Sequence, residues 1–246
     1  FHETLRYFRV ALADAEVDVQ LNRRVIAMDL VGFDDVVLAT GVTPRIPDVK
    51  GIDHPKVVTY LDVLRDHVSV GSTVAVMGAG GIGFDVAEYL TQSGPSATVT
   101  PDRFYAEWGI DTSYSNRGGL TQVHLERPPR KITLLQRKHS KVGGGLGKTT
   151  GWIHRTELKK RGVDMVPGVT YESIDDAGLH MTIDDQPVVL DVETIVVCTG
   201  QEPQRELLAD LEAAPATVHV IGGADVAAEL DAKRAIKQGT EVAAAL

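Results

Sequence analysis

Cysteine is nearly absent from this 246-residue sequence, in which Cys198 is the only one. One thiol cannot form an intrachain disulfide, a tetrahedral site of zinc thiolates or an iron–sulfur cluster, so these 246 residues hold none of them. Such sparing use of cysteine is typical of cytosolic proteins, and we expect a cytoplasmic location.

Basic residues are also fewer than acidic residues. The sequence has 25 Lys and Arg against 34 Asp and Glu, which gives a net charge of −9 at pH 7. An acidic chain repels phosphate backbones and anionic headgroups, so we expect no nucleic-acid partner and no membrane partner. No apolar run reaches the roughly 18 residues of a transmembrane helix, and no segment has the form of a signal peptide.

The sequence begins with Phe1 and not with methionine, so we expect the chain to continue upstream. Hydrophobic residues make up 43% and charged residues 24%, which is the composition of a globular protein. At roughly 100–200 residues per domain, 246 residues suffice for two domains.

Apolar segments of strand and helix type alternate along the chain, which is typical of an α/β fold. We expect strands over 17–22, 33–41, 73–77, 131–138, several segments of 163–192, 193–200 and 217–221. We expect helices over 3–16, 82–90, 149–162 and 227–246, with one or two helical turns within 52–68. Residues 93–130, rich in glycine, proline and polar residues, form an insertion with one short helix.

The most specific motif is the segment Gly78-Ala79-Gly80-Gly81-Ile82-Gly83. It fits G-x-G-x-x-G between a predicted strand and a predicted helix, which is the context of a dinucleotide-binding turn. The first glycine permits the tight turn, the second admits the pyrophosphate and the third allows close packing of helix and strand. The N-terminus of the helix then presents its N–H groups to the phosphates.

The end of the next strand indicates which dinucleotide is bound. In such folds an acidic residue about 20 positions after the first glycine binds the ribose 2′-hydroxyl of NAD. Arg137 follows Gly78 by 59 residues, of which the insertion accounts for 38, leaving 21. Arg137 and Lys138 therefore take the acid's place, where they would pair with a 2′-phosphate, so the sequence predicts NADPH. The alternative is that both are solvated residues at a strand end.

Two segments of similar form suggest a second, related unit. Residues 36–44 and 196–203 each run from an apolar strand through Thr-Gly to a proline, which places Thr40, Gly41, Thr199 and Gly200 at strand ends as candidates for binding FAD or NADPH. Residues 218–225 end in Gly223 and Asp225 before a predicted helix near 226–228. That aspartate could bind the ribityl hydroxyls of FAD, and the helix N-terminus could stabilise a reduced flavin.

The remaining motifs and residues give only weak indications of function. The segment 143–150, GGGLGKTT, lacks the first glycine of a phosphate-binding loop because Val142 stands there; we expect it to close the adenosine end of the cofactor site. Trp108 and Trp152 are interpreted as packing residues, and Cys198 as a small buried residue. The histidines show no metal-ligand spacing, and no catalytic acid, base or nucleophile is identified.

Together these segments resemble the C-terminal part of bacterial NADPH-dependent 2,4-dienoyl-CoA reductases. The resemblance covers nearly the whole chain and includes FHETLRYFR, GIDHPKVVTYLDVLRD, GAGGIGFDVAEYL, EWGIDTS, LLQRKHSKVGGGLGKTTGWIHRTEL, RGVDMVPGVTYESIDDAGLH, GQEP and GGADVAAELDAKRAI. It implies a Rossmann-like NADPH-binding domain at 69–202, inserted into a partial FAD-binding domain at 1–68 and 203–246.

The resemblance also implies an activity. In the family, NADPH reduces FAD, and electrons pass through a four-iron cluster to FMN in an N-terminal barrel, which reduces dienoyl-CoA during β-oxidation of unsaturated fatty acids. The barrel, its FMN site and the cluster ligands have no counterpart here, and the FAD domain's own glycine turn is absent. We therefore expect this chain to bind NADPH, to hold FAD poorly and not to reduce dienoyl-CoA alone. The alternatives are an enoate reductase or amine dehydrogenase of related architecture, or a non-catalytic dinucleotide-binding module.

Overall fold

The computed structural model describes residues 2–211, 215–228 and 231–246, which divide into two units. Unit 1 comprises residues 1–42 and 203–246, and unit 2 comprises residues 43–202. The sequence predicts the first boundary at 68/69, whereas the structure places residues 43–68 in unit 2. The reason is a short strand, β3 (Val57–Thr59), which pairs in parallel with residues 195–197 of unit 2.

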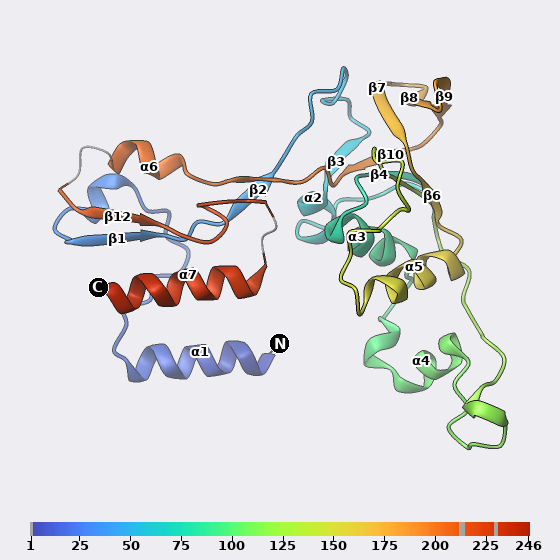
Figure 1. Cartoon of the computed structure of the whole chain (residues 1–246), viewed down its shortest axis with the longest axis horizontal. Coiled ribbons are helices and arrows are strands. Elements are labelled where there is room, and N and C mark those ends of the chain that lie inside the picture. The colour runs from blue at the N-terminus through green and yellow to red at the C-terminus, as the bar shows by residue number, and fades with distance from the viewer. Residues whose placement is uncertain (1, 212–214, 229–230) are drawn as a thin grey trace. The chain divides into compact units, whose positions relative to one another are not determined.

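Unit 2 is built on a five-stranded parallel sheet (Figure 1). Its strand order is β3-β10-β4-β5-β6, with β10 at Thr194–Val197, β4 at Thr73–Met77, β5 at Lys131–Leu135 and β6 at Asp164–Val166. The central strand β4 runs in register with both neighbours, pairing Val76 with Val196 and with Leu134. The predicted strand at 73–77 is thus confirmed. The predicted strands at 131–138 and 193–200 are confirmed in their first parts, but β5 ends at Leu135 and β10 ends at Val197, so residues 136–138 and 198–200 are loops.

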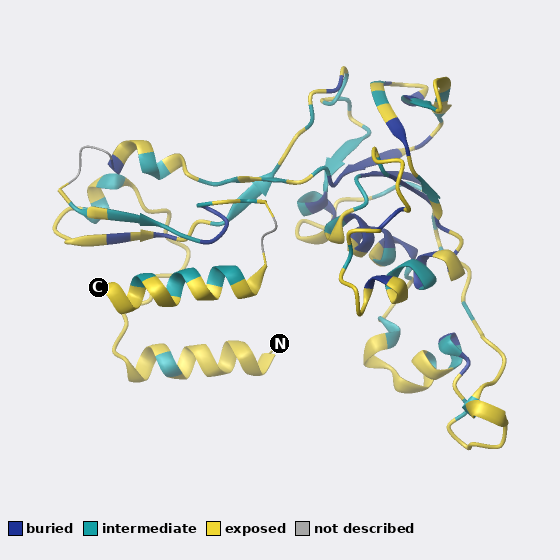
Figure 2. Ribbon diagram, in the orientation of Figure 1, coloured by how far each residue is buried: buried dark blue, intermediate teal, exposed yellow. Residues whose placement is uncertain are grey.

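The two faces of this sheet are covered by different layers. One face packs against α2 (Tyr60–Leu64), α3 (Gly81–Thr91) and α5 (Gly151–Lys160), and its core contains Val74, Val76, Phe84 and Leu158. The other face packs against an antiparallel sheet of β7 (Val169–Asp175), β8 (Gly178–Ile183) and β9 (Gln186–Leu190), and its core contains Ala75, Met77, Leu179 and Met181. The alternation of β4 side chains between the two faces explains its uninterrupted apolar sequence. Figure 2 shows the buried central strands of this sheet in dark blue, whereas β3 is half-buried.

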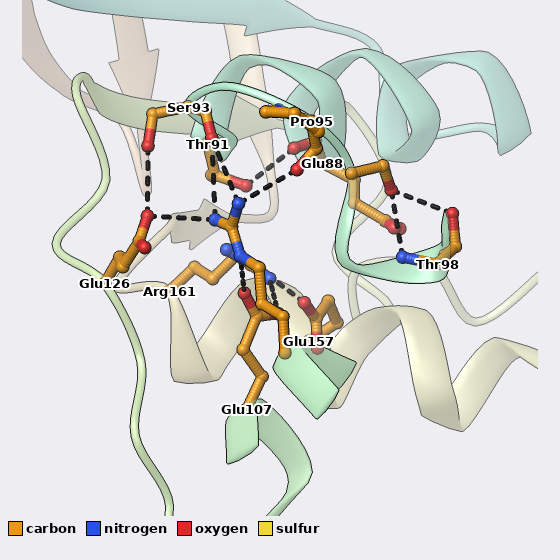
Figure 3. Close-up of polar contacts among 11 residues, drawn as sticks. Glu88, Thr91, Ser93, Pro95, Thr98, Glu107, Glu126, Glu157 and Arg161 are labelled. Carbon is orange, nitrogen blue, oxygen red and sulfur yellow. Dashed lines mark hydrogen bonds and ion pairs between the residues drawn. The ribbon is translucent and has the colours of Figure 1, made fainter. Parts of the chain in front are cut away.

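The insertion 93–130 connects α3 to β5 within unit 2. It contains the expected helix, α4 (Pro101–Trp108), and two 3₁₀ turns at Ala97–Val99 and Arg117–Gly119. Buried ion pairs fasten it to α5 (Figure 3). The Arg161 guanidinium lies 2.7 Å from Glu107 of α4 and 2.5 Å from Glu157 of α5. Glu107 also pairs with Arg103 at 3.0 Å, whose guanidinium binds the carbonyl of Pro95 and the carboxylate of Glu126.

Unit 1 contains the parallel pair β1 (Asp35–Leu38) and β12 (Thr217–Val220), with α1 (His2–Asp14), a 3₁₀ turn at Ala27–Leu30, α6 (Glu206–Leu211) and α7 (Ala232–Ala245). Val36, Leu38 and Leu211 form its small core. A further short pair joins β2 (Val42–Pro44) and β11 (Gln201–Pro203). The pattern predicts no helix at 206–211.

Two sequence predictions in unit 1 are wrong. Residues 17–22 form a loop and not a strand, bounded by Glu16 and Asn22 in the left-handed region at φ +54° and +57°. The closing helix starts at Ala232 and not near residues 226–228, because residues 222–226 turn back on the carbonyl of Gly222 and Asp231 caps the helix through the N–H of Arg234. Residues 229–230 of the predicted helix lie outside the described residues.

Candidate functional site

Three loops meet at the carboxyl edge of the unit 2 sheet, because β10, β4 and β5 are adjacent and parallel. They are the glycine turn Gly78–Gly83 after β4, residues 136–138 after β5 and residues 198–200 after β10. The chain leaves β4 toward β5, while β10 lies on the other side of β4. Such a reversal of strand order opens the crevice in which doubly wound sheets bind their ligands.

The outer glycines of the turn are required by close packing. Gly78 has φ +108°, and a Cβ atom there would lie 2.3 Å from the carbonyl oxygen of Cys198. A Cβ atom on Gly83 would lie 1.9 Å from the carbonyl oxygen of Gly78. Both glycines therefore bring the turn, the first turn of α3 and the end of β10 into backbone contact. Ala79 and Ile82 pack against the helix-side core.

The middle glycines, in contrast, border open space. A Cβ atom on Gly80 or Gly81 would meet no atom within 4 Å. Gly80 is the N-cap residue of α3 and supplies no side-chain cap, so the first N–H groups of this 11-residue helix have no capping partner. A cradle that a side chain would fill, lined by helical N–H groups, fits a pyrophosphate.

Arg137 and Lys138 lie exposed directly after β5, as the sequence predicts. Their loop is held by Gln136, a residue that no sequence pattern singles out. The Gln136 amide nitrogen donates to the carbonyls of Lys138 at 2.9 Å and Ser140 at 2.7 Å, and its oxygen accepts from the Gly143 N–H at 3.2 Å. The Gln136 side chain thereby fixes the loop that presents the two cations.

Arg137 borders a cavity of about 540 Å³ at this edge, together with Arg45, Tyr171 and Thr199. Arg45 donates to the carbonyl of Thr199, and the Thr199 hydroxyl donates to the carbonyl of Arg45 at 2.9 Å. Gly200 follows at φ +111°. Thr199 thus lies at the same edge as the glycine turn, and Arg45 adds a cation that sequence reasoning missed.

The Tyr171 hydroxyl, also at this cavity, is buried without a hydrogen-bond partner. Burial raises the pKa of Tyr171 above its usual range, and Arg137 and the backbone at Gly78 act in the opposite direction. The phenol is therefore neutral at physiological pH, and Tyr171 lines the cavity from β7.

The flavin candidates lie in unit 1, at the carboxyl ends of β1 and β12. The Thr40 hydroxyl donates to the carbonyl of Gln204 at 2.5 Å, and Gly41 has φ +78°. Gly223 is buried, and an Asp225 carboxylate oxygen accepts from the Gln238 amide at 2.8 Å. Adjacent parallel strands thus carry both candidate turns at one edge, but the Asp225 carboxylate is held by α7 and does not precede a helix directly.

Trp108 and Trp152 have different surroundings. Trp108 is half-buried, and the Lys160 ammonium lies 3.9 Å from its ring centroid, which agrees with a packing role. Trp152 is 56% exposed at the start of α5, so its interpretation as a packing residue is wrong. Helix α5 begins at Gly151, and the Trp152 ring N–H donates to the carbonyl of Thr149 at 3.0 Å.

Cys198 is buried between the glycine turn and the core, and burial raises the pKa of its thiol to about 12. The thiolate that reacts with alkylating agents is therefore scarce at pH 8. We expect Cys198 in the folded protein to resist iodoacetamide at pH 8 and to react within minutes in guanidinium chloride, as measured by intact mass. Rapid alkylation of the folded protein would contradict this burial.

None of the helices in the described ranges is both long and apolar enough to cross a membrane. Within the same ranges, no group of three or more acidic, histidine or cysteine side chains is arranged to hold a metal ion.

Comparison with known proteins agrees with this architecture. The chain is 26% identical over 227 residues to a metal reductase of Desulforamulus reducens, covering 89% of this chain and 32% of that protein. It superposes on a structure of 2-naphthoyl-CoA reductase in complex with 2-naphthoyl-CoA with a TM-score of 0.73 and 21% identity, over 97% of this chain and 31% of that one. A 6-hydroxypseudooxynicotine amine oxidase of Pseudomonas geniculata N1 gives a TM-score of 0.68 and 19% identity, over 92% of this chain and 31% of that one.

The chain thus spans about a third of the length of these relatives. A protein-family model matches residues 6–233 of the chain. This range includes most of both units, the glycine turn and the loop after β12. The match implies NAD(P)H and FAD as ligands and oxidoreductase chemistry as the activity. This chain belongs to the pyridine nucleotide-disulphide oxidoreductase family.

Proposed function

We propose that this chain is the electron-entry part of a cytosolic NADPH-dependent 2,4-dienoyl-CoA reductase. The observation that carries the proposal is the open cradle at Gly80 and Gly81, which lies at the same sheet edge as Arg137. A dinucleotide with an extra phosphate on its adenosine ribose fits a pyrophosphate cradle followed by a cation in place of the usual acid.

The residues present fit NADPH. The N–H groups at the start of α3 would bind its pyrophosphate, and Arg137 and Lys138 would bind its 2′-phosphate. When bound, NADPH supplies a hydride that a flavin accepts. Gly78 and Gly83 hold the cradle open by letting the backbone segments touch, and Gln136 fixes the loop that carries the cations.

The residues of unit 1 fit FAD only in part. Thr40, Gly41, Gly223 and Asp225 stand at neighbouring strand ends, where they would contribute to one side of a flavin site. The single G-x-G-x-x-G of the sequence lies in unit 2, so unit 1 has no such turn for the FAD pyrophosphate. We therefore expect this chain alone to bind FAD weakly.

The substrate follows from the sequence resemblance and is supported by one relative. This chain matches 31% of the length of the 2-naphthoyl-CoA reductase structure, and that enzyme acts on a thioester of coenzyme A. In the proposed enzyme, FMN, the four-iron cluster and the dienoyl-CoA site belong to a barrel outside these 246 residues. We expect the purified chain to oxidise NADPH with an artificial acceptor and added FAD, and not to reduce dienoyl-CoA.

An amine-oxidising enzyme of related architecture is the second candidate, because an amine oxidase matches 92% of this chain at a TM-score of 0.68. The requirement for NADPH as electron donor discriminates between the two candidate functions. An enzyme that takes electrons from an amine needs no NADPH as donor, whereas the proposed reductase cannot turn over without it.

Arg137→Asp should weaken NADPH binding by about 10- to 100-fold and leave NADH binding nearly unchanged. This range corresponds to the roughly 1.5–3 kcal/mol of hydrogen bonds to a charged group. Fluorescence titration of both nucleotides measures the effect.

Lys131→Asp is the matched control, since it makes the same kind of charge reversal at the other end of β5, roughly 20 Å away at 3.3 Å per residue. We expect Lys131→Asp to change neither affinity. An equal loss of NADPH and NADH affinity in Arg137→Asp would contradict the assignment of the 2′-phosphate to Arg137.

A further inference from the structure

A second cavity, of about 350 Å³, lies at the amino edge of the unit 2 sheet, the edge opposite the glycine turn. It is lined by the loop 67–70 before β4, by the end of α3 and by Arg130 directly before β5. It has no lining residue in common with the Arg137 cavity. Because doubly wound sheets bind nucleotides at the carboxyl edge, this cavity is separate from the proposed NADPH site. Its volume lies in the range of roughly 300–1,000 Å³ that is usual for small-molecule sites.

Arg130 brings a positive charge to this cavity, and none of the ion pairs among the described residues includes it. No acidic residue lines the cavity. The acid nearest to the lining loop in the sequence, Asp66, pairs with Arg65 at 2.7 Å. The charge of the half-buried Arg130 is therefore available to an anionic ligand, although the chain as a whole carries a net charge of −9.

Backbone carbonyls hold the Arg130 guanidinium in place without neutralising it. Its Nε donates to the carbonyl of Val70 at 3.4 Å, and its Nη1 donates to the carbonyl of Leu90 at 3.3 Å. Both bonds are longer than the usual N–H···O distance of about 2.7–3.2 Å. They leave Nη2 without an acceptor among the described residues, so the guanidinium can still donate to a carboxylate. His67 lines the same cavity and can donate one further N–H.

The rest of the cavity is largely apolar. Val63 and Leu90, each 2% exposed, form its buried part. Val68 and Tyr89 also line it, and they are 44% and 46% exposed. A ligand with an apolar body would remove these two side chains from water, which is favourable in proportion to the area covered. The cavity thus combines one permanent cation with an apolar and aromatic wall.

We propose that this cavity binds a small organic monocarboxylate, whose carboxylate pairs with Arg130 and whose apolar body packs against Val68 and Tyr89. A monocarboxylate fits better than a phosphate, because the cavity offers a single permanent cation and its remaining wall is apolar. A neutral molecule of the same shape would leave the guanidinium without a counter-charge. The proposal does not depend on NADPH binding at the glycine turn, because the two cavities have different residues.

Saturation-transfer NMR of the purified 246-residue chain with hexanoate as the probe tests the proposal. Hexanoate should bind saturably, whereas hexanamide, which lacks the charge, should bind at least about tenfold more weakly. Arg130→Met should weaken hexanoate binding by about tenfold or more, as expected for the loss of a charge-assisted contact. Arg127→Met is the matched control, because it removes an exposed arginine three residues earlier that does not line the cavity, and it should leave the affinity unchanged.

A second variant tests the apolar wall. Tyr89→Ala removes an aromatic ring that is 46% exposed, so the chain should fold normally. We expect this variant to bind hexanoate severalfold more weakly, because the hydrocarbon chain loses its contact with the ring. Unchanged hexanoate affinity in Tyr89→Ala, or equal affinities in Arg130→Met and Arg127→Met, would overturn the proposal.

Two measurements on the unsubstituted chain complete the test. Should Arg130→Met fail to fold, because its guanidinium also holds two backbone carbonyls, the comparison of hexanoate with hexanamide decides alone. Equal affinity for the two, or no saturable binding of hexanoate, would overturn the proposal. Hexanoate should bind equally well when NADPH is present in excess, whereas displacement by NADPH would place the carboxylate in the nucleotide site and overturn the proposal. Failure of the chain to bind NADPH contradicts only the proposed function.

Discussion

Gly83→Ala is expected to lower the free energy of unfolding of unit 2 by about 1–3 kcal/mol, the usual cost of forcing extra atoms into a packed site. The added Cβ atom would lie 1.9 Å from the carbonyl oxygen of Gly78 and 3.6 Å from Leu134, so α3 must move away from the turn. NADPH affinity should fall with it, because the N–H groups at the start of α3 move as well. Chemical denaturation and NADPH titration measure the two effects.

Gly80→Ala separates the two effects, since its Cβ atom would meet no protein atom within 4 Å and its φ of −82° suits alanine. We expect an unchanged free energy of unfolding and an NADPH affinity lower by about 10- to 100-fold, since the methyl group occupies the cradle. Normal NADPH binding by Gly80→Ala would show that the pyrophosphate does not lie there. Unchanged stability of Gly83→Ala would contradict the packing of α3 on the turn.

Arg161→Met is expected to destabilise unit 2 by about 3–5 kcal/mol, the usual result of removing one member of a buried ion pair. Arg161 is 7% exposed and Glu107 is 5% exposed, and both carboxylates that flank the guanidinium would lose the positive charge of Arg161. Arg103 would still pair with Glu107, but Glu157 would retain no counter-charge from Arg161 (Figure 3). The free energy of unfolding in guanidinium chloride measures the effect.

Two variants control for this prediction. Arg65→Met removes an arginine from an exposed pair with Asp66 and should leave stability unchanged within error. Adding Glu107→Gln and Glu157→Gln to Arg161→Met should recover most of the lost stability, because the uncompensated charges are then gone. If Arg161→Met proves as stable as Arg65→Met, the ion pairs do not fasten the insertion to α5.

The features that the sequence predicts well are those with local signals. Strand β4 spans Thr73–Met77 as expected, since an apolar run ending in glycine encodes a buried parallel strand. The spacing of the glycines alone predicts the turn and the start of α3. Gly78 and Gly83 are required there because a Cβ atom at either position would overlap a backbone carbonyl oxygen. Arg137 could be placed by counting, once the insertion was set aside.

The remaining features depend on contacts between distant residues. Strand β3 is only three residues long, and its pairing with β10, more than 130 residues later, moves the boundary between the units. The pairing of Arg161 with Glu107 joins residues 54 positions apart, with no periodic signal between them. Trp152 is 56% exposed at the start of α5, and residue type alone does not encode whether a tryptophan there is packed or exposed.

Equilibrium titration of the purified chain with NADPH and with NADH tests the central claim most directly. The structure predicts saturable binding of one NADPH per chain, at least about tenfold tighter than NADH, because Arg137 and Lys138 stand where an acid would select NADH. Absence of saturable NADPH binding, or equal affinity for the two nucleotides, would contradict the assignment of this edge of the sheet as an NADPH site.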